Sequence, residues 1–102
     1  MCKSSAPGTA NATIFIENHR TRVTEWRFSK RGDNTGWHRH EHDYVVVPLF
    51  DGVLVIENAA GERSQAELKN GVPYFRNLGV EHDVISGNDF PCAFIEIEFL
   101  KP

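Results

Sequence analysis

The chain of 102 residues has little cysteine, a single methionine and no strong excess of either charge. Its 11 Lys+Arg and 14 Asp+Glu give a formal net charge of −3, which argues against a nucleic-acid footprint or an acidic tail. No apolar run approaches the roughly 18 residues of a membrane helix, and residues 1–12 lack the apolar stretch of a signal peptide. These absences favour a cytoplasmic domain whose partner is a small molecule, with no nucleic acid and no membrane.

The two cysteines, Cys2 and Cys92, are too few for the disulfide framework of a small secreted domain. Neither lies beside a basic cluster that would lower the pKa of its thiol. We expect both thiols to be reduced and inert, which agrees with a cytoplasmic location.

The length allows one domain, and a hydrophobic share of 40% with 11% aromatics is enough for one core. We expect a flexible N-terminal arm over residues 1–12 and a single domain over residues 13–102. Short alternating or β-branched blocks, bounded by turn residues, predict strands at 13–17, 22–28, 43–49, 53–57, 63–68, 73–76, 81–85 and 93–99. Such strands indicate an all-β sandwich or barrel.

Several turns and faces can be assigned within this pattern. Asp51-Gly52 predicts a hairpin turn, and Gly52, Gly71 and Gly79 lie where turns are expected to need positive φ. In residues 22–28 the alternation places three side chains on one face, namely Thr24, Trp26 and Phe28.

The most informative stretch is 37–44, WHRHEHDY, in which His38, His40 and His42 are spaced two residues apart. Side chains two apart on a strand share a face at roughly 6.5–7 Å, so two imidazoles can bind one ion at about 2.0–2.1 Å. All three can do so only if the strand bends, which makes His82 on a later strand the candidate for a further ligand. The competing interpretations are a solvated polar face and a pH-responsive histidine cluster.

The glycine and histidine spacings resemble the two motifs of the cupin family. The first family motif is Gly, five residues and His-x-His, then a Glu and a closing Gly. In this chain five residues separate Gly32 from His38-Arg39-His40, and Gly52 stands at the closing turn.

The second family motif is Gly, five residues, Pro-x-Gly, two residues, His, three residues and Asn. Here Gly71 is followed at these spacings by Asn77-Leu78-Gly79, His82 and Ser86. Together the two motifs span residues 32–86 in the family's order, and the combined pattern is specific where either motif alone would be weak.

This resemblance implies an all-β fold, the cupin double-stranded β-helix or jelly-roll barrel, with a metal in its mouth. The implied ligands are His38, His40 and His82. We also expect a homodimer, which an exposed aromatic sheet face would support.

The sequence departs from the family at the glutamate ligand, because the corresponding positions hold Tyr44 or Val45. The site is then most simply a three-His site with open positions, and His42 is the alternative fourth ligand. Such a site suits a divalent first-row metal such as Fe, Zn, Ni or Mn. Tyr44 can supply a hydroxyl close to the metal or to a substrate.

The stretch TGWHRHEHDYVVVPLFDG and the closing FIEIEF are also similar to the single-domain cupins described as β-alanine degradation proteins. This resemblance implies a role in small amino-acid or carboxylate catabolism. With Fe(II) the expected enzyme is a dioxygenase, and with Zn, Ni or Mn it polarises a carbonyl for isomerisation or hydration. The alternatives are a non-catalytic cupin that binds or senses a small carboxylate, and a metal-free barrel that responds to pH.

Three further side chains bear on the site. Glu96 and Glu98 share one face of the strand 93–99, and they either face solvent or point into the barrel. If Glu96 points inward, it can act as a general base or support a metal-bound histidine. Arg76 either forms a surface ion pair or binds a substrate carboxylate through two hydrogen bonds.

Overall fold

The computed structural model describes residues 3–4 and 8–100. These residues form strands and loops without a helix. The strands are β1 (Lys3–Ser4), β2 (Asn11–Glu17), β3 (Thr21–Phe28), β4 (His38–Arg39), β5 (Asp43–Pro48), β6 (Gly52–Glu57), β7 (Arg63–Leu68), β8 (Tyr74–Arg76), β9 (Glu81–Ser86) and β10 (Cys92–Phe99). The predicted all-β class is confirmed, and the described residues contain no helix that could span a membrane.

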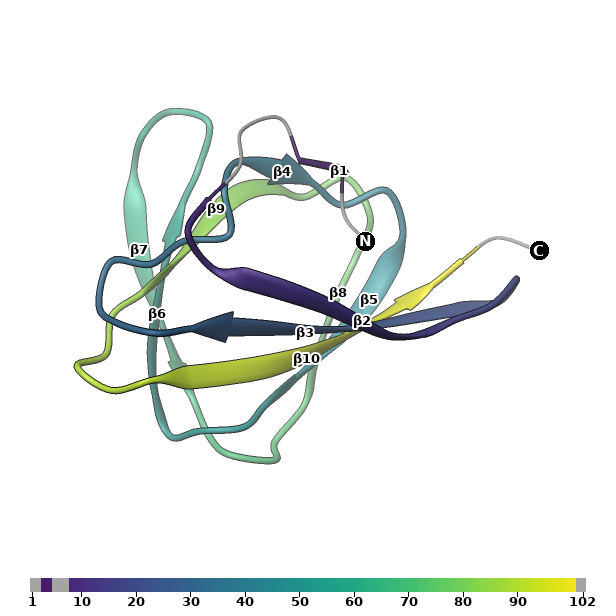
Figure 1. Cartoon of the computed structure of the whole chain (residues 1–102). Helices are drawn as coiled ribbons and strands as arrows, with labels where there is room; N and C mark the ends of the chain where they lie inside the picture. The colour runs from purple at the N-terminus through teal and green to yellow at the C-terminus, as the bar shows by residue number, and fades with distance from the viewer. Residues whose placement is uncertain (1–2, 5–7, 101–102) are drawn as a thin grey trace.

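The strands form two five-stranded sheets whose neighbouring strands are antiparallel. One sheet has the order β1-β4-β9-β6-β7 and the other has the order β2-β3-β10-β5-β8 (Figure 1). In Figure 1 the long strands β2, β3 and β10 run side by side across the front, and β6 and β7 close the barrel at one side. The inward faces of the two sheets enclose the core.

The predicted hairpin at Asp51-Gly52 is wrong. β5 pairs with β10 and β8, whereas β6 pairs with β7 and β9, so this turn carries the chain from one sheet to the other. The positive φ expected at Gly52 is wrong as well, although Gly71 and Gly79 have φ values of 77° and 93°. Gly52 is required for space instead, because a Cβ there would collide with the side chain of Asn88.

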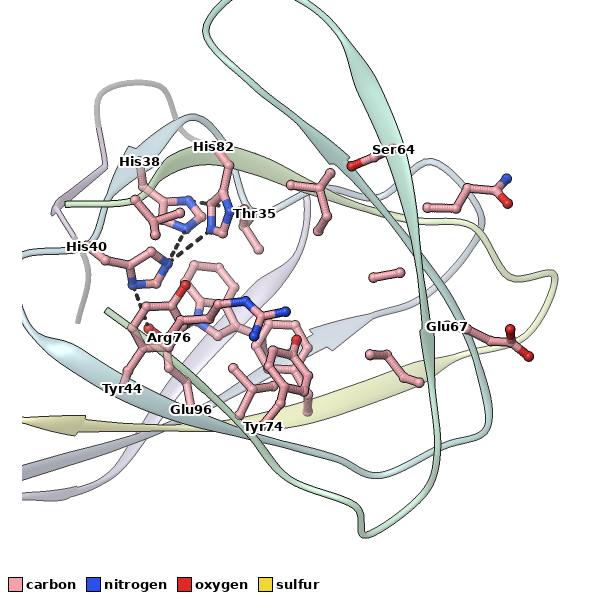
Figure 2. A pocket seen from close by; sticks show the side chains of 18 residues that line it. Thr35, His38, His40, Tyr44, Ser64, Glu67, Tyr74, Arg76, His82 and Glu96 are labelled. Atoms are coloured by element: carbon pink, nitrogen blue, oxygen red, sulfur yellow. Dashed lines mark hydrogen bonds and ion pairs between the residues drawn. The ribbon is translucent and has the colours of Figure 1, made fainter. Parts of the chain in front are cut away.

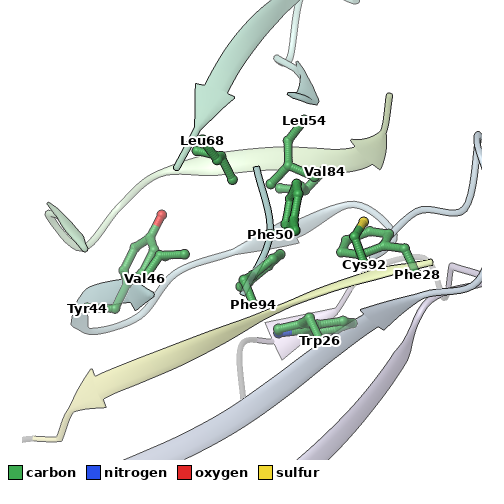
Figure 3. Packing of buried hydrophobic residues seen from close by; sticks show 10 residues of the cluster. All are labelled: Trp26, Phe28, Tyr44, Val46, Phe50, Leu54, Leu68, Val84, Cys92 and Phe94. Carbon is green, nitrogen blue, oxygen red and sulfur yellow. The ribbon is translucent and has the colours of Figure 1, made fainter. Parts of the chain in front are cut away.

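The core lies between the sheets and is built from large side chains (Figure 3). Thr24, Trp26 and Phe28 are all buried, so the predicted face of β3 is confirmed. The buried apolar cluster comprises Trp26, Phe28, Tyr44, Val46, Phe50, Leu54, Leu68, Val84, Cys92 and Phe94. Cys92 is therefore a buried free thiol, whereas Cys2 lies outside the described residues.

The C-terminal half of β10 reverses the usual arrangement of a strand that covers a core, whereas Cys92 and Phe94 on the same face are part of that core. Glu96 and Glu98 point inward and are only 2% and 1% exposed, while Ile95, Ile97 and Phe99 lie on the outer face. The expectation that these glutamates face solvent is wrong, and the expectation that they point into the barrel describes the structure. The buried carboxylates are placed directly behind the candidate site.

The N-terminal region contributes more structure than strand patterning indicates. β2 begins at Asn11 rather than at residue 13, and Lys3 and Ser4 pair with β4. The flexible arm expected over residues 1–12 falls partly on residues 1–2 and 5–7, which lie outside the described residues. The described part next to β2 is tied to the barrel, since the Ala10 amide donates to the Asn34 carbonyl at 2.8 Å.

Candidate metal centre

Three histidines meet at the end of the sheet that contains β4 and β9. His38 and His82 are directly opposite each other in the β4–β9 pair. His40 follows β4, and its backbone is tied to the same loop that precedes β9. Its amide donates to the Val80 carbonyl at 2.9 Å, and the Gly79 amide donates to the His40 carbonyl at 2.8 Å. The two segments predicted from the motifs are therefore joined by backbone hydrogen bonds.

The Nε2 atoms of the three imidazoles converge on one point (Figure 2). Nε2 of His40 lies 3.1 Å from Nε2 of His38 and 3.0 Å from Nε2 of His82. Nitrogens at these separations can all lie at the roughly 2.0–2.1 Å bond length of a zinc-type ion. The donor set and its spacing therefore fit a single divalent transition metal.

The opposite ring nitrogens of two of these histidines are held by hydrogen bonds. Nδ1 of His38 lies 2.8 Å from the Gly36 carbonyl oxygen, and Nδ1 of His40 lies 3.2 Å from Oε1 of Glu96. A carbonyl and a carboxylate can only accept, so each Nδ1 carries the proton and each Nε2 presents a lone pair. Partners of this kind fix the tautomer and orientation of metal-binding imidazoles.

The environment also favours the uncharged form of two of these imidazoles. Burial, together with the neighbouring His38 and His40, lowers the pKa of His82 to about 3. Burial likewise lowers the pKa of His38, against the opposing effect of its hydrogen bond to Gly36. Neutral imidazoles are the form that binds metal ions.

Glu96 connects the histidines to the interior of the barrel. Besides contacting His40, it accepts a hydrogen bond from Nε1 of Trp26 at 2.8 Å. Its neighbour Glu98 is held by Arg22, whose Nε and Nη2 donate to the two carboxylate oxygens at 2.9 and 3.2 Å. Burial raises the pKa of Glu98, the charge of Glu96 adds to this effect, and Arg22 opposes it.

Of the two other predicted site residues, Tyr44 lies against the histidine cluster and His42 lies outside it. The Tyr44 ring stacks on the His40 imidazole at 3.8 Å between centroids, and both side chains are buried. His42 is not part of the cluster, and among the described residues its Nδ1 is a buried atom without a hydrogen-bond partner. The chain bends after β4, because residues 40–42 lie between β4 and β5, so the alternation that relates His38 to His40 does not extend to His42.

The histidines line a cavity of about 650 Å³, which is the size of a small-molecule site. Its walls combine apolar side chains with polar groups from both sheets. The lining residues are Trp26, Thr35, His38, His40, Tyr44, Val46, Ile56, Ser64, Gln65, Ala66, Glu67, Leu68, Tyr74, Arg76, Val80, His82, Phe94 and Glu96. The sequence placed Trp26 on one face of its strand without giving it a part in the site, and it gave no role to Thr35, whose hydroxyl lies 3.2 Å from Nδ1 of His38.

Comparison with known proteins identifies relatives of the whole chain, although no family model matches. The chain is 50% identical over 86 residues to the β-alanine degradation protein BauB of Pseudomonas aeruginosa. The aligned region covers 84% of this chain and 88% of that protein. The crystal structure of a cupin domain from Bordetella pertussis is 46% identical with a TM-score of 0.86, covering 97% of this chain and 100% of that one.

A more distant structure supports the same architecture. A protein of Klebsiella pneumoniae with a double-stranded β-helix domain is 17% identical with a TM-score of 0.70, covering 95% of this chain and 80% of that one. At this identity the likeness shows the fold alone. The predicted double-stranded β-helix is thus confirmed, and the chain belongs to the cupin family as a small member similar to BauB.

Proposed function

We propose that the protein is a metal-dependent cupin enzyme that acts on a small polar or carboxylate metabolite in β-alanine or amino-acid catabolism. His38, His40 and His82 would hold one divalent ion: Fe, Zn, Ni or Mn. The observation that carries this proposal is the meeting of three imidazoles on the wall of a cavity, with Nε2 of His40 about 3 Å from Nε2 of both His38 and His82. The relationship to BauB supports the metabolic context.

A bound ion of this kind supplies either Lewis acidity for isomerisation or hydration, or, as Fe(II), a binding place for dioxygen. The side chains of this protein hold and orient it. Glu96 retains the proton on Nδ1 of His40, and Trp26 fixes the carboxylate of Glu96 by its indole N–H. We therefore assign Glu96 a positioning role, because its two oxygens face His40 and Trp26.

Tyr44 is the second residue to which we assign a role in the reaction. It lines the cavity and its ring supports the His40 imidazole by stacking. A phenol at this position can donate a hydrogen bond to a bound substrate. His42 is not carried into the proposal as a ligand, because it does not belong to the converging group.

Metal binding tests this proposal directly. Titration calorimetry of the metal-free protein with Fe(II), Zn(II), Ni(II) and Mn(II) is expected to give one site per chain for at least one ion. His38→Ala and His82→Ala should abolish that site, whereas His19→Ala, an exposed histidine in a turn, should leave it unchanged. Lack of metal in protein from its native host, together with no binding at micromolar concentration, contradicts the proposal.

A second candidate function is a non-catalytic cupin that binds or senses a small carboxylate. It is favoured by the absence of a carboxylate from the converging group of described ligands, which consists of histidines alone. The two functions separate in one assay. Turnover of short β-amino, β-hydroxy or β-oxo acids by the metal-loaded protein supports the enzyme, whereas binding without turnover supports the sensor.

We also propose a cytoplasmic homodimer formed through the outer face of the sheet β2-β3-β10-β5-β8, here called the second sheet. An apolar row crosses all five strands of this sheet, because Phe75 pairs with Val45, Val45 with Ile97, Ile97 with Val23, and Val23 with Ile16. Phe75 and Ile16 at its two ends are 50% and 51% exposed. A second copy of the chain would cover this row, since an extended apolar face marks an interaction surface.

A further inference from the structure

The strand β8 carries an arginine into the cavity. In the β5–β8 pair Arg76 lies opposite Tyr44, and Tyr74 lies opposite Val46. Directly paired residues share a face of a sheet, so Arg76 and Tyr74 are on the inner face with Tyr44. In Figure 2 the Arg76 side chain extends across the cavity between the histidines and Tyr74.

The guanidinium of Arg76 is held in place without being neutralised. Its Cζ lies 4.6 Å from the centre of the Tyr74 ring, and its Nη1 donates to the Phe75 carbonyl at 2.9 Å. These contacts leave the Nε and Nη2 donors without a protein partner among the described residues. An oriented guanidinium loses less side-chain freedom when it binds a ligand than one that moves freely.

Most other arginines of the protein are paired with an acid. Arg22, Arg27, Arg31, Arg39 and Arg63 each form an ion pair with Asp or Glu. Within residues 8–100 only Arg20 and Arg76 do not, and Arg20 lies in an exposed turn that is not part of the cavity. The one arginine on the cavity wall is thus available to an anion from outside the chain.

Neither carboxylate of the cavity wall forms an ion pair with this guanidinium. Glu96 is hydrogen-bonded to His40 and Trp26, and Glu67 is exposed on β7 with its carboxylate directed away from the histidines in Figure 2. A divalent ion held by the histidines, as the proposed function requires, would add to the positive charge of Arg76, and a cavity of that kind attracts anions.

We propose that Arg76 binds the carboxylate of a short aliphatic ligand and so places the opposite end of that ligand at the histidine cluster. The planar guanidinium matches a carboxylate through two parallel hydrogen bonds. Apolar walls that include Val46 and Phe94 suit a short carbon chain between the two polar ends. This inference rests on the proposed function and names its ligand class: a small carboxylate with a hydroxyl, amino or carbonyl group a few carbons away.

Binding of matched acid and amide probes to the Zn(II)-loaded protein tests this inference. The probes are glycolate, 3-hydroxypropionate and 4-hydroxybutyrate, together with the corresponding amides. Their binding is measured by calorimetry and by ¹⁵N chemical-shift changes of the protein. We expect at least one acid to bind tenfold or more tightly than its amide. Arg76→Gln should remove this preference, Arg76→Lys should retain part of it, and Arg27→Gln, an exposed arginine on the other face of its sheet, should leave it intact.

The failure of this inference can be distinguished from the failure of the proposed function. If the wild type binds Zn(II) but does not prefer acids, or if Arg76→Gln keeps the preference, the role of Arg76 is wrong and the metal site stands. If no metal binds, the proposed function is wrong, and the same acid and amide titrations of the metal-free protein still decide the role of Arg76. Thermal unfolding and Zn(II) stoichiometry of Arg76→Gln, expected to match the wild type, show that this variant is folded.

Discussion

Nδ1 of His40 lies 3.2 Å from Oε1 of Glu96, and both side chains are buried at 3% exposure. Removing a carboxylate from water is costly unless hydrogen bonds replace the lost hydration. Here the replacements are the imidazole and the indole N–H of Trp26 at 2.8 Å. The carboxylate therefore acts on the site through the orientation of His40.

The first prediction concerns this pair. Glu96→Gln keeps the shape of the side chain but removes its charge, so the proton on Nδ1 of His40 is held less firmly. We expect metal affinity to fall about 10- to 100-fold, as for other residues that support metal-binding histidines. Competition with a metal chelator measures this loss, and Glu57→Gln, which removes a carboxylate paired with Arg63, is the matched control. Equal affinities of the two variants would show that Glu96 serves packing alone.

The second prediction concerns stability. A ligand that binds only the folded chain stabilises it by about 2.7 kcal/mol at a free concentration of 100 Kd. For a domain of this size the corresponding rise in Tm is roughly 10–20 °C. Calorimetric scans with the bound metal and after chelation should show this difference in the wild type and in His19→Ala, but not in His40→Ala. A Tm that is independent of the metal in the wild type contradicts a site formed only by folding.

The third prediction is a pH dependence of the metal-free protein. In the unfolded chain His82 takes up a proton near its ordinary pKa of about 6.5, whereas burial lowers its pKa to about 3 in the folded chain. The unfolded state therefore binds more protons between these values, and stability is lost as the pH falls from 6.5 towards 3. The slope for one such proton is at most about 1.4 kcal/mol per pH unit.

Urea unfolding at several pH values in the presence of chelator measures this dependence. His82→Gln removes the titrating group, so its stability should fall less steeply over the same range than that of the wild type. His19→Ala provides the comparison, because His19 is exposed. Parallel curves for the wild type and His82→Gln would mean that the His82 imidazole does not resist protonation in the folded chain.

The fourth prediction concerns association. Ile16→Lys places a charge at the exposed end of the apolar row on the second sheet, and a charge buried between two copies is costly. Light scattering during size-exclusion chromatography should show a dimer for the wild type and a monomer for this variant. Val72→Lys, at an exposed valine outside the row, should remain dimeric. A monomeric wild type would refute the homodimer.

The histidine cluster was predictable from the sequence because its information is local. The two-residue spacing of His38 and His40 and the turn at Gly79 before His82 restrict where these side chains can point. The position of His42 could not be predicted from the same spacing, because side-chain alternation holds only within a strand and the chain bends between β4 and β5.

The direction of β10 and the position of Arg76 on the cavity wall were not predictable in this way. An alternating strand has two faces, and the sequence does not say which face meets the core. For FIEIEF the apolar face lies outside, because the inner face meets Arg22 and His40. The position of Arg76 follows from its register with Tyr44. The prediction of a hairpin at Asp51-Gly52 was wrong because β5 and β6 pair with strands distant in sequence, which place them in different sheets.

The two faces of β10 belong to the candidate site and to the proposed dimer contact. Glu96 on the inner face supports the histidines, and Ile97 on the outer face lies in the centre of the apolar row. Loading of the cavity and association of two copies would each order the same eight-residue strand. If both events occur, the one that orders this strand first lowers the entropy cost of the other, and we expect the two to cooperate without any change in shape. The candidate site and the proposed contact between subunits would then lie on opposite faces of one strand.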